Sequence, residues 1–444
     1  MTTTVALATL GCKVNQYESA AISGDFEAAG CRLTPFSGAA DIYVINTCAV
    51  TGRAEQESRR LIRRALRMNP QARVLVTGCY AQADPAAVRG VDPRIELLGN
   101  ASKHLLAGLA LAEGPGNLSG EPGEIRRQAA PCPLVVHRFP GRTRGLLKVQ
   151  DGCDNFCAYC IVPYVRGRSR SVPLAQVLRQ AELLAAAGYR ELVVTGINVG
   201  KYGRDLPGHP DVSGLLRRLC RDFPSLRLRL SSIEPPEVSD DLLAMAAGHA
   251  NFMPHFHLPL QSGDEGVLRA MRRRYGGGVF AAVVRRCRQA LPDAALGADV
   301  LVGFPGEDQE AFARTHDLLA SLPLSSLHVF PYSARPGTLA AAMTDQVPLP
   351  VREERAAVLR ALDIRLRRDF IGSQLGRIRP VLLESRAAGP GLLRGHSDNY
   401  LAVTLAAPAR LLGQVVDVRL EGPDGAGGVR GRLVADSRQR HEKG

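Results

Sequence analysis

The sequence predicts a multidomain α/β protein, with an open α/β domain at the N-terminus, a partial (β/α)6 barrel in the middle and a small β-barrel at the C-terminus. A chain of 444 residues exceeds what one hydrophobic core usually organises. Apolar strand-like runs alternate with helical stretches up to about residue 370, and short β-like runs with glycine-rich turns follow. A segment rich in Gly and Pro, residues 114–133, separates the first two parts.

The N-terminal domain is predicted to span residues 1–113. Its runs at 5–8, 42–45 and 74–76 are mostly apolar, as in strands that are buried on both faces of a parallel sheet. Residues 54–68 place apolar and arginine side chains on opposite sides at helical spacing, so an amphipathic helix is expected there.

The middle domain is predicted to span residues 139–370, after a linker at 114–138. Helical stretches lie between most of its six strand-like runs, which is typical of a barrel of β/α units. The six runs are 146–149, 192–194, 226–230, 256–258, 298–302 and 327–330.

The C-terminal domain is predicted to span residues 371–438. Its runs at 379–383, 401–405 and 415–420 are short and joined by glycine-rich turns, which indicates a small barrel or sandwich.

Composition indicates a globular chain with an excess of positive charge. Lys and Arg number 56 against 43 Asp and Glu, for a net charge of +13, which fits either an anionic partner such as RNA or an arginine-rich proteome. No apolar run approaches the ~20 residues of a membrane-spanning helix, and the N-terminus lacks a signal-peptide pattern. We therefore expect a cytoplasmic protein without a membrane partner. Structural disulfides are not expected among its ten cysteines, and those in patterned positions are expected to serve metal or redox chemistry.

Cys153, Cys157 and Cys160 form a C-x3-C-x2-C group directly after the first predicted barrel strand. Functional groups of parallel α/β folds lie at the carboxyl ends of strands, so this position suits a site. Three thiolates leave one coordination position open, whereas structural zinc takes four protein ligands. An iron–sulfur cubane with one open iron is favoured, and a zinc site remains the alternative.

Cys12, Cys48 and Cys79 are far apart in sequence, yet each follows a predicted strand of the first domain. Carboxyl ends of neighbouring parallel strands lie along one sheet edge, so these three loops are expected to converge on a second three-thiolate site. Buried free cysteines without a role are the alternative. The remaining cysteines, Cys31, Cys132, Cys220 and Cys287, are expected to be structural.

The C-x3-C-x2-C group resembles the cluster motif of radical S-adenosylmethionine enzymes. Together with the second trio and the motifs at 231–235, 257–263, 299–307 and 330–338, it makes the chain similar to the methylthiotransferase family. The resemblance implies two [4Fe-4S] clusters, S-adenosylmethionine and a C-terminal RNA-binding domain called TRAM. By position it also suggests cofactor-binding residues, namely Tyr159, Asn198, Ser232 and Glu234, with Arg274 and Asp299 as weaker candidates and no catalytic residue beyond the cluster ligands.

Residues 11–18 and 46–51 resemble the family branch that acts on N6-threonylcarbamoyladenosine at position 37 of tRNA. The implied activity is radical methylthiolation of adenine C2, with the tRNA anticodon stem-loop as partner and a one-electron donor such as flavodoxin or ferredoxin. Methylthiolation of isopentenyl-adenosine or of a ribosomal-protein aspartate, and a non-catalytic iron–sulfur protein, are the alternatives. A row of arginines in the helix at 54–68 suits either phosphate contacts or a solvated face. The row comprises Arg60, Arg63, Arg64 and Arg67.

Overall fold

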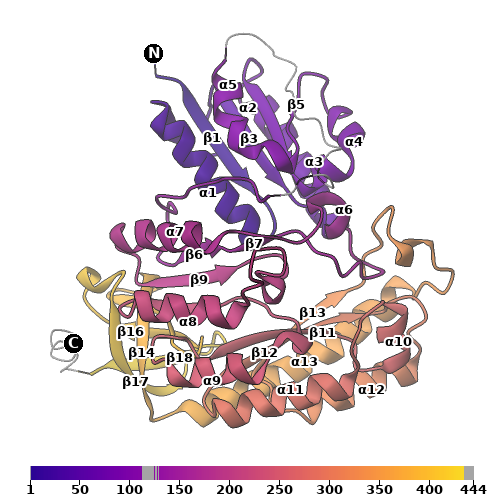
Figure 1. Ribbon diagram of the computed structural model, residues 1–444, viewed down its shortest axis with the longest axis vertical. Helices are drawn as coiled ribbons and strands as arrows, with labels where there is room; N and C mark the ends of the chain where they lie inside the picture. Colours follow the sequence, from indigo (N-terminus) through magenta and orange to yellow (C-terminus); the bar gives the residue numbers. More distant parts are fainter. Residues whose placement is uncertain (1, 113–124, 126–127, 129, 435–444) are drawn as a thin grey trace.

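The computed structural model describes residues 2–112, 125, 128 and 130–434 (Figure 1). Most of the predicted linker, residues 114–124, 126, 127 and 129, lies outside the described residues, as do residues 435–438 of the predicted C-terminal domain. Among the described helices, none combines the length and apolarity that crossing a membrane requires.

The N-terminal part is a five-stranded parallel sheet in the order β2-β1-β3-β4-β5. The predicted strands are confirmed as β1, β3 and β4, which are neighbours at its centre. The bounds are β1 Thr4–Thr9, β2 Arg32–Thr34, β3 Ile42–Thr47, β4 Arg73–Gly78 and β5 Glu96–Leu97.

Helices cover both faces of this sheet, because successive apolar residues of its strands point to opposite sides. Val5 and Val44 pack with Ile22 and Leu106 of α1 and α5 in one core, whereas Ile45 packs with residues of α2 and α4 in another. The helices are α1 Lys13–Ala28, α2 Gly52–Met68, α3 Cys79–Ala83, α4 Pro85–Arg89, the 3₁₀ helix η1 Asn100–Leu105 and α5 Leu106–Leu111.

The middle part is an open barrel of six parallel strands, as predicted. The strands follow the order β6-β9-β10-β11-β12-β13, with isolated parallel bridges (Leu228 to Phe252 and Ser232 to His257) joining β10 to β11. No pairing between β6 and β13 occurs in the described part of the chain, so the barrel stays open between them. The bounds are β6 Gly145–Lys148, β9 Glu191–Thr195, β10 Arg227–Leu230, β11 His255–Gln261, β12 Ala295–Val302 and β13 Ser326–Pro331.

Helices surround the barrel and bury its apolar outer face (Figure 1). They are α7 Leu174–Ala186, α8 Val212–Asp222, α9 Asp240–Gly248, α11 Gly277–Ala290, α12 Gln309–Ala320 and α13 Leu349–Gln374. Shorter elements lie in the loops, namely β7 Gln150–Asp151, α6 Val162–Arg166, β8 Arg170–Ser171, η3 Val199–Lys201, η4 Pro235–Glu237, α10 Glu265–Ala270 and η5 Leu339–Ala342.

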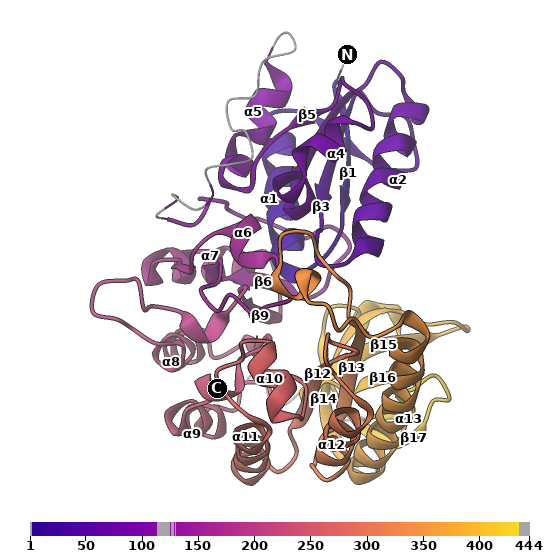
Figure 2. The same ribbon diagram turned by 90° about the vertical axis from the view of Figure 1, so that its right-hand side faces the viewer.

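The C-terminal part is a closed antiparallel and parallel barrel in the order β14-β15-β16-β18-β17, which confirms the small β-barrel. Arg227 and Arg229 of β10 donate to its backbone carbonyls, so it packs against the barrel of six strands near their amino ends. In Figure 2 it lies beside α13, away from the N-terminal sheet. Its elements are β14 Ile378–Arg386, β15 Leu392–Ser397, β16 Ala402–Ala406, η6 Ala409–Leu411, β17 Val415–Pro423 and β18 Val429–Leu433.

Candidate active site

Cys12, Cys48 and Cys79 converge at the carboxyl edge of the N-terminal sheet. They follow β1, β3 and β4, which are adjacent strands. The backbone leaves little space between two of the loops, since a Cβ atom at Gly11 would lie 2.8 Å from the sulfur of Cys48. Cys48 and Cys79 are buried and Cys12 is exposed, so the site opens on the Cys12 side.

Buried polar side chains fix these three loops relative to one another. The amide of Asn15 donates to the carbonyls of Leu10 (2.7 Å) and Thr47 (2.9 Å), which connects the loops after β1 and β3. The hydroxyl of Thr47 donates to Thr77 O and accepts from Ala81 N, which connects the loops after β3 and β4. The geometry around the three thiols is therefore held by hydrogen bonds within the sheet edge.

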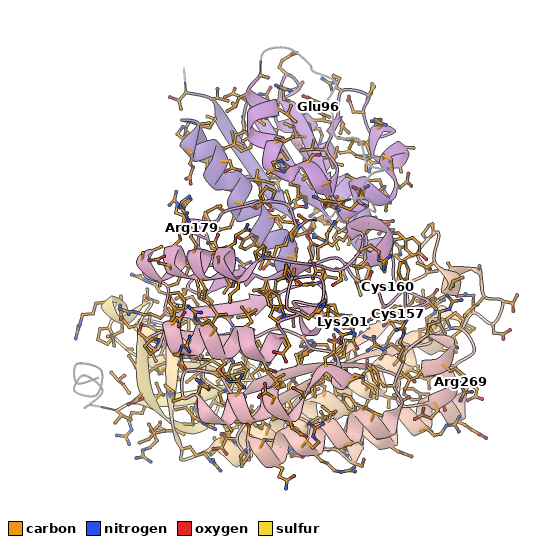
Figure 3. All side chains as sticks on the ribbon, viewed as in Figure 1. Glu96, Cys157, Cys160, Arg179, Lys201 and Arg269 are labelled. Carbon is orange, nitrogen blue, oxygen red and sulfur yellow. The ribbon has the colours of Figure 1, made fainter. Side chains whose placement is uncertain are left out.

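Cys153, Cys157 and Cys160 lie in the loop after β6 and β7. The loop turns at Gly152 (φ +72°), where any Cβ atom would overlap the carbonyl of Arg168. The amide of Cys153 donates to Gly167 O at 3.1 Å, and the amide of Cys160 donates to Cys157 O at 3.0 Å. In Figure 3, Cys157 and Cys160 lie where the barrel meets the N-terminal part of the chain.

Polar side chains lie close to the sulfurs of the second trio. Asn198, at the carboxyl end of β9, places its amide nitrogen 3.9 Å from the sulfur of Cys153, and its buried side-chain oxygen has no partner among the described residues. Arg273 lies 3.8 Å from the sulfur of Cys157 and 3.0 Å from a carboxylate oxygen of Glu234. Both groups suit the polar ends of a ligand bound at the cysteines.

Cys48, Cys153 and Cys160 need a nearby cation to ionise at neutral pH. Burial raises the pKa of Cys153 to about 11, of Cys160 to about 12 and of Cys48 to about 11. Such groups are neutral thiols at pH 7, and a coordinated metal removes their protons.

The arrangement of the thiols favours an iron–sulfur cluster over a single zinc ion. With a Zn–S length of ~2.3 Å, tetrahedral zinc holds its sulfurs about 3.8 Å apart. In the described part of the chain, neither cysteine trio is compact enough to enclose a single ion. A cubane spreads its ligands further, because each cysteine binds a different iron.

A buried charge network connects the two trios. Arg166 of α6 places Nη1 2.9 Å from Glu18 and 3.0 Å from Asp151, and it also donates to Asn15. Lys148 and Lys103 complete the charge balance by pairing with Asp151 and Glu18. All five ionic side chains are buried, so the first trio's scaffold and the second trio's strand form one rigid unit.

A cavity of about 1010 Å³, the central chamber, lies between the three parts of the chain. Gly11, Cys12 and Lys13 contribute to its lining, together with barrel residues such as Ser232 and C-terminal residues such as Tyr400. The exposed member of the first trio therefore faces this chamber.

Ser232, predicted to bind the cofactor, lines the central chamber, whereas Glu234 lines a separate cavity of about 150 Å³ beside Cys157. Ser232 and Glu234, which lie in one loop, thus line two different cavities. Ser232 hydrogen-bonds to His257 at 2.7 Å.

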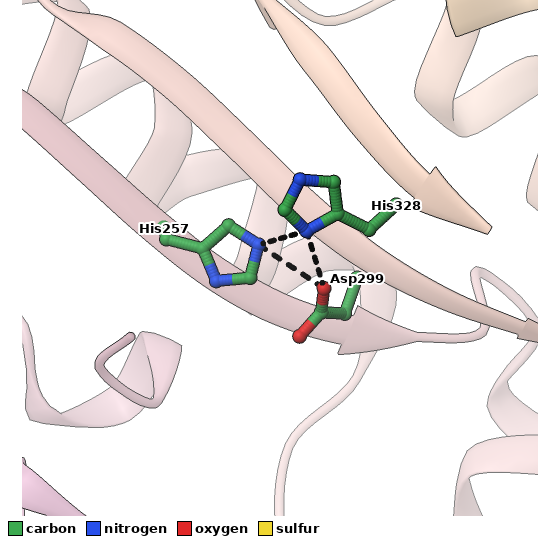
Figure 4. Close-up of side chains that lie close together, drawn as sticks. All are labelled: His257, Asp299 and His328. Atoms are coloured by element: carbon green, nitrogen blue, oxygen red, sulfur yellow. Dashed lines mark hydrogen bonds and ion pairs between the residues drawn. The ribbon is translucent and has the colours of Figure 1, made fainter. Parts of the chain in front are cut away.

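A triad of His257, Asp299 and His328 lies on the chamber wall (Figure 4). One carboxylate oxygen of Asp299 is 3.1 Å from His257 Nε2 and 3.2 Å from His328 Nδ1. Burial raises the pKa of Asp299, but these two hydrogen bonds outweigh it and hold the pKa below its ordinary value. Asp299 is therefore an ionised carboxylate with two imidazole rings within hydrogen-bond distance.

The other predicted site residues lie in the loop of the second trio, on α2 and in the segment that follows α10. Tyr159 is half-buried in the second trio's loop, with its ring centroid 6.5 Å from that of Phe304. The arginines at positions 63, 64 and 67 are exposed on α2, and Arg60 pairs with Glu57 at 2.7 Å. Arg274 is exposed, whereas Arg273 reaches Cys157.

Sequence reasoning missed Arg166, Arg273 and Glu18. The signal for Arg273 is ambiguous, because three consecutive arginines, 272–274, precede Tyr275 and only one turns inward. Glu18 and Arg166 carry no local signal, since charged residues are ordinarily exposed.

Family models match both cysteine-bearing parts of the chain. Residues 4–99 match the model described as Uncharacterized protein family UPF0004, and residues 147–319 match the Radical SAM superfamily. A radical S-adenosylmethionine methyltransferase, TsrM from Kitasatospora setae, has a TM-score of 0.57 at 17% identity over 77% of this chain and 75% of its own. That likeness concerns the fold.

Curated relatives match over nearly the full length. A threonylcarbamoyladenosine tRNA methylthiotransferase of Bacillus subtilis is 38% identical over 94% of this chain and 93% of its own. One from Rickettsia prowazekii is 36% identical over 92% and 94%. Such identity over both chains, with both cysteine trios in the matched regions, establishes a radical enzyme that uses S-adenosylmethionine and [4Fe-4S] clusters. The chain belongs to the radical S-adenosylmethionine methylthiotransferase family.

Proposed function

We propose that this enzyme transfers a methylthio group to C2 of N6-threonylcarbamoyladenosine at position 37 of tRNA. The observation that carries the proposal is the opening of the Cys12 site into a chamber large enough for a modified nucleoside. The relatives named for this substrate support the choice of nucleoside, since they align over nine-tenths of both chains.

In this proposal the two cysteine trios have separate roles. Cys153, Cys157 and Cys160 hold the cluster that binds S-adenosylmethionine, and Cys12, Cys48 and Cys79 hold the auxiliary cluster. When bound, these groups supply a radical that breaks an unactivated C–H bond and an anchor for the transferred sulfur, chemistry that side chains cannot perform.

The protein's own side chains bind and orient the cofactor and the substrate. Asn198 and the Arg273–Glu234 pair offer a hydrogen-bond donor, a cation and a carboxylate beside the second trio, where the methionine and ribose ends of the cofactor require such partners. Tyr159 packs the loop and excludes water. An unpaired anticodon-loop base enters the chamber at modest cost, because it leaves no duplex partner.

The wider setting follows from this substrate. A tRNA partner places the enzyme in the cytoplasm, and a one-electron donor such as flavodoxin or ferredoxin supplies the electron for cofactor cleavage. The exposed arginines of α2 and the net charge of +13 suit contact with the anticodon stem.

The test is a reaction of the reconstituted enzyme with two tRNAs, one carrying threonylcarbamoyladenosine and one carrying isopentenyl-adenosine. Each reaction contains S-adenosylmethionine and a reductant, and the digested nucleosides are measured by mass spectrometry. A methylthio product from the first tRNA alone is expected. A product from the second tRNA alone would show that the substrate assignment is wrong, and no product from either would contradict the activity.

A further inference from the structure

The lining of the central chamber holds more basic than acidic side chains. Of its 29 lining residues, five are Lys or Arg and four are His, whereas Asp299 is the single acid. Asp299 lies within hydrogen-bond distance of His257 and His328, whose ring N–H groups partly offset its negative charge. The charged side chains of the chamber wall thus favour a negatively charged ligand over a positively charged one.

Most of these cations are already paired. Three arginines of the lining bond to carboxylates outside it, at 2.7 to 3.1 Å, and so contribute little free charge. These pairs are Arg144 with Glu384, Arg229 with Glu191, and Arg367 with Asp363. The side chains of Lys13 and Arg394 differ, because neither forms a hydrogen bond or an ion pair with any residue that the structure describes.

Lys13 is the free cation nearest to the auxiliary site. It is exposed, it follows Cys12 directly, and it begins α1. Burial holds the pKa of His255, at the start of β11, well below its ordinary value. The positive charges of Arg229 and Lys13 contribute in the same direction. Lys13 therefore lines the chamber next to Cys12 of the first trio, on a wall that also includes Arg229 and His255.

The proposed substrate carries an anion that related nucleosides lack. A threonylcarbamoyl group ends in a carboxylate and a hydroxyl, whereas an isopentenyl group is a hydrocarbon. Its carboxylate branches from the adenine edge that also carries C2, so the anion must lie near the sulfur donor during transfer. An unpaired ammonium next to Cys12 meets that requirement.

We propose that Lys13 is a specificity-determining residue that binds the carboxylate of the N6-threonylcarbamoyl group. This inference rests on the proposed function and deepens it, since it names the group that selects the nucleoside. A charge-assisted hydrogen bond in a partly enclosed chamber is among the stronger polar contacts that a protein offers.

The experiment measures binding of anticodon stem-loop RNAs by fluorescence anisotropy. Three RNAs are compared, with threonylcarbamoyladenosine, its carboxylate methyl ester, or plain adenosine at position 37. Wild-type enzyme should bind the first about tenfold more tightly than the other two, as expected for one contact to a charged group. Lys13→Met should abolish this preference without changing affinity for the plain RNA, and Lys13→Arg should retain most of it.

Arg394→Met is the matched control, because it removes the other unpaired cation of the chamber from the C-terminal barrel. It should change affinity for all three RNAs by the same factor. If Lys13→Met weakens all three RNAs equally, Lys13 contacts phosphate and the proposal is overturned. It is also overturned if the preference survives in Lys13→Met, or if Arg394→Met alone removes it.

Failure of the proposed function is distinguishable from failure of this inference. If wild-type enzyme forms the methylthio product yet binds the acid and its ester equally, Lys13 does not select the carboxylate and only the inference fails. If wild-type enzyme forms no methylthio-threonylcarbamoyladenosine at all, the proposed function itself fails.

Discussion

Arg166 and Glu18, which are 148 residues apart in sequence, form a buried ion pair with 2.9 Å between Nη1 and Oε1. Glu18 belongs to the helix that begins beside Cys12, and Arg166 belongs to the helix that follows Cys160. Because Arg166 also bonds to Asp151, one guanidinium joins the scaffolds of both cysteine trios.

Replacing Arg166 by Met should lower the free energy of unfolding by about 3–5 kcal/mol, since it leaves two buried carboxylates short of a partner. Urea titration followed by circular dichroism measures this change. Arg168→Met is the control, because Arg168 is exposed and pairs with exposed Asp154, so a loss below about 1 kcal/mol is expected. Equal losses in the two variants would contradict a special role for the buried pair.

Glu191 should make stability depend on pH in the acid range. Burial raises the pKa of Glu191, but the guanidiniums of Arg229 and Arg227 outweigh it and lower the pKa to about 2, below the ordinary value of 4.5. The stabilisation is therefore complete above pH 4.5 and is lost as pH falls toward 2. In this range the Glu191 carboxylate is protonated in the unfolded chain but remains ionised in the folded protein.

The measurement compares thermal midpoints of wild type and Glu191→Gln from pH 7 to pH 3. The variant should be less stable at pH 7, and the gap should narrow below pH 4.5. For the exposed Glu310, a Gln variant should track wild type throughout. A Glu191→Gln gap that stays constant with pH would show that its pKa is not depressed.

Gly11→Ala should remove the auxiliary cluster while leaving the other intact. Gly11 has φ +92°, and an added Cβ would meet the Cys48 sulfur at 2.8 Å. Gly30→Ala is matched for backbone strain of about 1–2 kcal/mol, because Gly30 has φ +82° but nothing within 4 Å of an added Cβ. Iron analysis after reconstitution should give about half the iron in Gly11→Ala and a full complement in Gly30→Ala. A full complement of iron in both variants would show that a methyl group at position 11 does not prevent Cys48 from binding the auxiliary cluster.

Replacing Cys12, Cys48 and Cys79 together by Ala should separate the two halves of the reaction. About four irons should remain of about eight, since each cubane holds four. The variant should still form 5'-deoxyadenosine from S-adenosylmethionine, because that step uses only the barrel site, but it should form no methylthio nucleoside. Chromatography and mass spectrometry of one reaction measure both. A normal yield of the methylthio nucleoside would show that these cysteines are structural.

The sequence predicts the parts of this structure whose signals are local. Strands β1, β3 and β4 are apolar runs buried on both faces, and the cysteines that follow them converge because parallel neighbours end at one edge. The edge strands β2 and β5 escape detection, since they have three and two residues and little apolar character.

Other features depend on tertiary context. Ser232 and Glu234 look equivalent in sequence, yet they line different cavities because the chain turns between them. Lys13 is an ordinary lysine until the fold shows that three arginines of the same chamber are paired with carboxylates and that its own ammonium group is not. The burial of Glu18 is visible only when Arg166 and Lys148, its two partners from the barrel part of the chain, are in place.

The sharing of Glu18 across domains sets an order of events during synthesis. The three auxiliary cysteines leave the ribosome before Arg166 does, and domains generally fold as units in the order they emerge. At that stage Glu18 has Lys103 as partner, but the side-chain oxygen of Asn15, whose amide spans the loops at Cys12 and Cys48, still lacks the guanidinium that later binds it. The surroundings of the auxiliary pocket are thus completed from outside its own domain, because the guanidinium that binds Asn15 and Glu18 arrives only with the first unit of the barrel.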